Sequence, residues 1–157
     1  MTPNQLPSDG VALVSAVDPI SQGAGSPAQV WTNVKNFHSF LAVLDVGVFG
    51  GSATVDFKLQ QATDSSGTGA KDITGKSITQ LVAAGGNNRQ AMINARASDM
   101  DQANSFNFIS FKITVGTAAT LVAAAMYGFY PRFEPVKDPG SNPAINLGAS
   151  SVAQIVS

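Results

Sequence analysis

Proline is confined to the two ends of this chain, and its distribution limits what the middle can form. Of the 8 prolines, half lie within residues 1–27 and the rest within residues 131–143. Proline removes a backbone donor and fixes φ, so the interior of a β-sheet excludes it. The sequence therefore predicts a central β domain over residues 28–133, with extended arms over residues 1–27 and 134–157.

Alternating apolar and polar residues predict strands in the proline-free region. Within residues 53–62, Val55, Phe57 and Leu59 face one way and polar side chains face the other. Residues 108–115 repeat this pattern, which has the two-residue period of a strand with one buried face. Weaker strand patterns cover residues 29–34, 78–82 and 90–95 of this region, and residues 11–17 of the N-terminal arm.

Two further segments, residues 39–48 and 121–130, are apolar on both faces. A strand of this kind is expected to be covered on both sides. Gly-rich and polar turns at residues 63–70 and 83–88 separate the strands at intervals of roughly ten residues, which is typical of a sandwich or barrel. The predicted fold is all-β, a single β-sandwich, with one short helical turn within residues 97–103.

The composition excludes several classes of function. Charged residues are 12% of the chain, about half the usual share, and the formal net charge is −1. Near neutrality argues against a nucleic-acid partner, which requires clustered Lys and Arg. No cysteine is present, so disulfides and thiolate metal sites are excluded. No signal peptide or bilayer-length apolar run is visible, so we expect no membrane partner and folding in the cytoplasm.

Three motifs suggest chemistry, and each has a more ordinary structural interpretation. Residues 70–77 (AKDITGKS) loosely match a phosphate loop, but a β-like segment follows where a helix is required, which favours a turn before a strand. His38 is the only histidine, which favours a structural role. Asp99 and Asp101 have calcium-ligand spacing but lack the remaining ligands, which favours a helix cap. We therefore predict no catalytic residue, cofactor or metal.

The arms carry apolar clusters and are expected to fray unless other subunits hold them. An extended arm can add a strand to a neighbour's sheet, which predicts a homo-oligomer. Aromatic residues at the junction of sheet and arm can also contact a partner, although most aromatic residues simply belong to a core. The predicted interface residues, which lie at these junctions or in the C-terminal clusters, are Trp31, Tyr130, Arg132, Phe133, Ile145, Leu147, Val152 and Ile155.

Four blocks of this sequence, residues 53–81, 93–101, 113–119 and 128–136, resemble small structural proteins of tailed bacteriophage and prophage virions. The resemblance covers mostly the predicted sheet, and the arms match least. It carries no catalytic or ligand motif to this chain.

The resemblance implies a β-sandwich, the jelly roll included, that decorates or cements a capsid. Such a protein joins a preassembled shell in the virion, often as a trimer, after synthesis in the host cytoplasm. Its implied partner is the major capsid protein or another virion protein. Two alternatives remain open: a neck, tail or head-fibre component, and a sandwich module that binds a host glycan or receptor.

Overall fold

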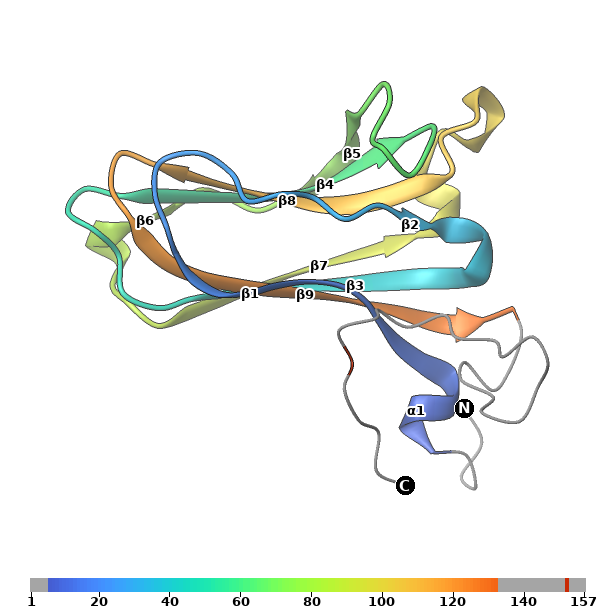
Figure 1. The fold of residues 1–157 in the computed structure, drawn as a ribbon, viewed down its shortest axis with the longest axis horizontal. Coiled ribbons are helices and arrows are strands. Elements are labelled where there is room, and N and C mark those ends of the chain that lie inside the picture. The colour runs from blue at the N-terminus through green and yellow to red at the C-terminus, as the bar shows by residue number, and fades with distance from the viewer. Residues whose placement is uncertain (1–5, 133–151, 153–157) are drawn as a thin grey trace.

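The chain folds as a β-sandwich of two antiparallel sheets that face each other (Figure 1). A computed structural model describes residues 6–132 and residue 152. The strands are β1 (Val11–Gln22), β2 (Thr32–Asn33), β3 (Phe37–Val46), β4 (Thr54–Ala62), β5 (Lys71–Ser77), β6 (Leu81–Val82), β7 (Arg89–Arg96), β8 (Phe108–Gly116) and β9 (Thr120–Pro131). The helical turns are α1 (Pro7–Gly10), η1 (Val34–Asn36), η2 (Ala83–Gly85), η3 (Ala97–Asp99) and η4 (Gln102–Asn104).

The strand order is that of a rolled hairpin. The lower sheet in Figure 1 has the order β1-β9-β3-β7, and the upper sheet has the order β2-β8-β4-β5, with β6 also paired to β4. The pairs β1·β9, β2·β8, β3·β7 and β4·β5 are nested, so the chain is one long hairpin wound across both sheets. This nesting gives the jelly-roll form of the sandwich.

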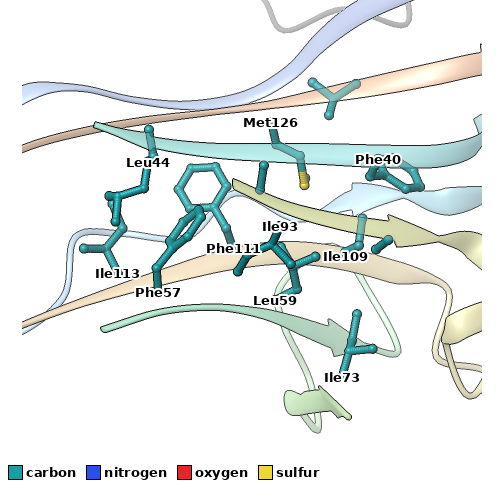
Figure 2. Close-up of a cluster of buried hydrophobic side chains, with 14 of the residues drawn as sticks. Phe40, Leu44, Phe57, Leu59, Ile73, Ile93, Ile109, Phe111, Ile113 and Met126 are labelled. Carbon is teal, nitrogen blue, oxygen red and sulfur yellow. The ribbon is translucent and has the colours of Figure 1, made fainter. Parts of the chain in front are cut away.

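The core fills the space between the sheets, as Figure 2 shows. Phe57 on β4 and Phe111 on β8 meet with ring centroids 5.8 Å apart, and both are buried. Leu44 and Met126 enter from the opposite sheet and are fully buried. Burying each such side chain stabilises the fold by about 1.5–3 kcal/mol. The apolar side chains that point inward therefore account for the alternating pattern in the sequences of β4 and β8.

Gly128 on β9 lies directly beneath an aromatic ring. A Cβ at this position would lie 2.6 Å from Phe37, whose side chain is fully buried. Phe37 also meets Phe40 edge to face, with ring centroids 6.0 Å apart. Only glycine leaves the space that this ring occupies.

The predicted N-terminal arm is wrong for residues 11–22, which form strand β1 of the sandwich. Its inward residues Ala12 and Val14 are buried in the core. The prediction treated Pro19 as a residue that excludes a strand. In the structure, Pro19 lies at a register shift between Val17 and Ile20, on the edge strand of its sheet. Proline is tolerated at such a bulge, where no ladder donor is lost. The predicted C-terminal arm, residues 134–157, lies outside the described residues except for Val152.

Other local predictions have mixed outcomes. Residues 71–77, expected as a turn before a strand, themselves form β5. The short helix expected within residues 97–103 is present as the 3₁₀ turns η3 and η4. Across the described residues, no helix has the length and apolar character that a bilayer crossing demands.

Candidate interaction surface

The two outward faces of the sandwich differ in chemistry. On the upper sheet, the outward residues paired between β4 and β8 are polar: Asp56 with Thr114, and Lys58 with Lys112. Lys58 forms an ion pair with Asp72 of β5, with Nζ and Oδ2 2.8 Å apart. This is the usual surface of a sheet exposed to water on one side.

The outward face of the lower sheet is apolar along β1, β9 and the middle of β3, whereas Asp45 of β3 and Gln90, Asn94 and Arg96 of β7 make its margin polar. Register places Leu13, Tyr127 and Leu41 side by side across β1, β9 and β3. The next outward row along the sheet brings together Ala125 and Val43. We call this surface the outer apolar face, formed by Val11, Leu13, Ala16, Leu41, Val43, Met92, Leu121, Ala123, Ala125, Tyr127 and Phe129.

Two residues of the outer apolar face are exposed, and its other members are half-buried. Met92 is 65% exposed and Leu121 is 46% exposed, while Leu41, Val43 and Tyr127 are half-buried. Among the described elements, α1 lies on this side of the sandwich, at one end of the lower sheet (Figure 1). A contiguous exposed apolar patch is characteristic of an interaction surface.

A hollow of about 570 Å³ lies at one end of the outer apolar face. Tyr130 stands on it with 59% of its surface exposed and a φ of 52°. A non-glycine residue in the left-handed region carries strain, and such strain is frequent at functional positions. The lining residues are Ser39, Phe40, Leu41, Lys76, Asn94, Ala95, Arg96, Asp99, Phe129 and Tyr130.

Asp99 organises the polar wall of this hollow. Its Oδ2 accepts a hydrogen bond from the backbone N–H of Arg96 at 2.9 Å and lies 2.9 Å from Nζ of Lys76. The hydrogen bond from Arg96, followed by the one from Lys76, lowers the pKa of Asp99 below its usual value of 3.8. The carboxylate thus ties β5 to the end of β7.

Asp99→Asn is expected to lower stability at neutral pH and to have no effect in strong acid. Because the folded-state pKa of Asp99 is depressed, its contribution is present above the usual value of 3.8 and is lost as pH falls through the folded-state pKa. For a partly exposed pair, we expect a loss of about 0.2–1 kcal/mol. Urea unfolding at about pH 7 and about pH 2 measures this difference.

The exposed Asp18, in β1, is the matched control. Asp18→Asn should leave the free energy of unfolding nearly unchanged at both pH values, because no ion pair holds Asp18 within residues 6–132. A pH-independent loss for Asp99→Asn would contradict the electrostatic explanation.

The structure separates the predicted interface residues. Tyr130 lies at the hollow, and Arg132 is exposed just beyond β9, with its backbone N–H bonded to the carbonyl oxygen of Asn36. Trp31 packs elsewhere, against Gly67, where an added Cβ would lie 2.5 Å from its indole nitrogen. Val152 is half-buried. The remaining predictions, Phe133, Ile145, Leu147 and Ile155, lie outside the described residues.

The structure places the residues of the three motifs as follows, and the turn predicted for residues 70–77 is wrong because residues 71–77 form a strand. Lys76 of the phosphate-loop motif belongs to strand β5 and pairs with Asp99. Asp101 accepts hydrogen bonds from the side chains of Lys71 and Asn104. His38 is exposed at the start of β3. Within the part of the chain that the structure describes, no three His, Asp or Glu residues gather as metal ligands do.

Sequence reasoning did not name the residues of the outer apolar face as a site. Its signal was nevertheless visible, because residues 39–48 and 121–130 are apolar on both faces. The prediction that both sides are covered holds for the inward side, where β3 and β9 form one wall of the core. On the outward side, Leu41, Val43 and Tyr127 remain partly open among the described residues.

Comparison with known proteins gives a likeness of fold at low similarity. No known protein family and no curated protein matches this sequence. A chain of the Israel acute paralysis virus pentamer aligns over 83% of this chain and 76% of its own, with 9% identity and a TM-score of 0.39. A cowpea mosaic virus empty-particle chain aligns over 90% of both chains, with 10% identity and a TM-score of 0.39.

A non-viral protein is similar to the same degree. A Bacillus endospore appendage pilus chain aligns over 83% of this chain and 99% of its own, with 14% identity and a TM-score of 0.35. Similarity at these levels does not carry a function to this chain.

Proposed function

We propose that this chain is a structural subunit of a virion, and specifically a decoration protein that binds the assembled capsid. The observation that carries the proposal is the contrast between the two outward faces. One is polar, with Asp56, Lys58 and Lys112, whereas the other presents Leu41, Val43 and Tyr127. An apolar sheet face of this kind fits burial against another protein.

The charge balance supports dense packing of many copies. With 9 basic and 10 acidic residues, the chain has a formal net charge of −1. Identical copies placed side by side on a shell therefore repel each other little. The resemblance of residues 53–81 and 128–136 to phage virion proteins favours a capsid as the partner.

In this proposal, the subunits act as a homo-oligomer, with a trimer favoured, on the major capsid protein or another virion protein. Contacts through the C-terminal arm join those of the sandwich, and several weak contacts together give a durable attachment. The proposed contact residues are those at the sheet–arm junctions and in the arm: Trp31, Tyr130, Arg132, Phe133, Ile145, Leu147, Val152 and Ile155.

A second candidate is a module that binds a host glycan. The hollow beside Tyr130 favours it, because an exposed aromatic ring next to Asn94 and Arg96 offers both stacking and hydrogen bonding to a sugar. A neck, tail or head-fibre component remains the alternative within the virion. Sugar-array binding by the isolated protein tests the glycan candidate.

Particle stoichiometry tests the decoration role. Particles produced with this chain present are purified, and its copy number relative to the major capsid protein is measured by quantitative mass spectrometry. A decoration protein is expected at a copy number comparable to that of the capsid protein, since it follows the shell's lattice. A few copies per particle would indicate a neck or tail component, and absence from particles would refute the virion role.

A further inference from the structure

The central strands of the lower sheet present an apolar surface that the described residues leave partly open. Register aligns Leu41 with Tyr127 and Val43 with Ala125 on the outward side. The opposite sides of β3 and β9 are sealed in the core by Leu44 and Met126. A strand with apolar residues on both faces is normally covered on both. We therefore expect this face to be covered by a segment of protein that is itself apolar and uncharged.

The end of this same chain has that chemistry. From Pro139 to Ser157 the sequence contains no charged side chain. It carries two apolar clusters, Ile145–Leu147 and Val152–Val156, separated by small and polar residues. Such a segment has few groups that favour solvent exposure, and its low polarity matches that of the outer apolar face.

The chain is also long enough to reach the face. The last strand ends at Pro131, at the end of the face that holds Phe129. An extended chain spans at most about 3.3–3.6 Å per residue, so the residues between Arg132 and Val152 can cover roughly 65 Å. Strand β9 has 12 residues, which corresponds to about 40 Å. The segment can therefore turn back after Arg132 and run the length of the sheet.

Val152 is the one residue of this segment that the structure describes. Its side chain is half-buried in the isolated molecule. Its sequence neighbours, Ser151 and Ala153, are small and cannot by themselves shield a valine. Its burial points to packing against another part of the same chain.

We propose that residues 144–156 lie across the outer apolar face of their own chain, where Ile145, Leu147, Val152 and Ile155 cover Leu41, Val43 and Tyr127. The segment keeps the free subunit soluble by hiding the surface that the particle partner later contacts. This proposal rests on the proposed function only for the identity of that later partner. The intramolecular cover itself is a property of the isolated protein.

Disulfide trapping tests the cover directly, because the natural chain has no cysteine. Val43→Cys is combined in turn with Ile145→Cys, Leu147→Cys, Val152→Cys and Ile155→Cys, and each dilute protein is oxidised. At least one pair is expected to form an intrachain disulfide, seen by peptide mapping and by faster migration without reductant. The matched control is Thr114→Cys, which places the same thiol on the polar outward face of the other sheet.

We expect the best Val43 pair to be trapped roughly tenfold faster than the same arm position paired with Thr114→Cys, because the cover raises the local thiol concentration. Equal rates for the two faces would overturn the proposal, as would crosslinks formed only between chains. Deleting residues 139–157 provides a second measurement and should raise binding of an apolar dye severalfold. Unchanged dye binding would also overturn it. Particle copy number, measured separately, decides the proposed function whichever result is obtained.

Discussion

Val43→Asp is expected to abolish incorporation into particles while the sandwich remains folded. Val43 lies near the centre of the outer apolar face, paired with Ala125 of β9 and Met92 of β7. An uncompensated charge buried in an interface costs about 3–5 kcal/mol. That penalty lowers affinity by roughly a hundredfold to a few thousandfold. Co-sedimentation with purified particles measures binding, and circular dichroism with thermal unfolding checks the fold.

Thr114→Asp is the matched control for this substitution. Threonine has nearly the shape of valine, and Thr114 points outward from β8 beside Asp56 on the polar face. An added carboxylate there stays in water, and its repulsion by Asp56 across the strand pair costs the fold only about 0.2–1 kcal/mol, so incorporation should be unchanged. Normal incorporation of Val43→Asp would show that the outer apolar face is not the contact. Equal loss for both variants would point to a general defect in the protein.

The strands with the clearest periodicity were predictable because local chemistry decides them. β4, β8 and β9 lie close to the ranges that alternation and apolar runs indicated. β5 was not recognised because Gly75 and its polar neighbours look like a turn. It is a strand because Asp72 and Ser77 pair across to β4, which is a long-range contact. β1 was assigned to an arm for the corresponding reason, since its bulge at Pro19 is visible only in the paired sheet.

The candidate interaction surface was only partly predictable. Apolar residues on both faces of β3 and β9 were apparent, and so was the need to cover them. The grouping of Leu13, Tyr127 and Leu41 into one row depends on strand order, which joins the first, last and third strands. No local pattern encodes this order. Likewise, the hollow at Tyr130 forms only because the start of β3 meets the ends of β7 and β9 beside Asp99.

Phe37→Ala is expected to produce the largest loss of stability among single substitutions considered for this chain, about 3–5 kcal/mol. The ring is fully buried, contacts Phe40 and lies over the backbone of Gly128. A domain of this kind has about 5–15 kcal/mol of total stability, so the loss is a large fraction of it. Denaturant unfolding followed by circular dichroism measures the change.

Gly128→Ala tests the same contact from the opposite side. Its new methyl group would lie 2.6 Å from the ring of Phe37, and overpacking of this kind costs about 1–3 kcal/mol. Gly23→Ala, where nothing lies within 4 Å of the added Cβ, is the control and should change stability by less than about 0.5 kcal/mol. If Gly128→Ala costs no more than Gly23→Ala, the ring does not rest on this glycine.

The double variant Phe37→Ala/Gly128→Ala separates direct contact from independent damage. When Phe37 is already truncated, the methyl group of Ala at 128 enters the space that the ring has left, so its own penalty should largely disappear. The combined loss is therefore expected to be smaller than the sum of the two single losses by about 1 kcal/mol or more, as for residues in contact. Strict additivity would mean that the two positions act separately. The closure of the jelly roll at this end would then depend on Phe37 through its contact with Phe40 rather than through β9.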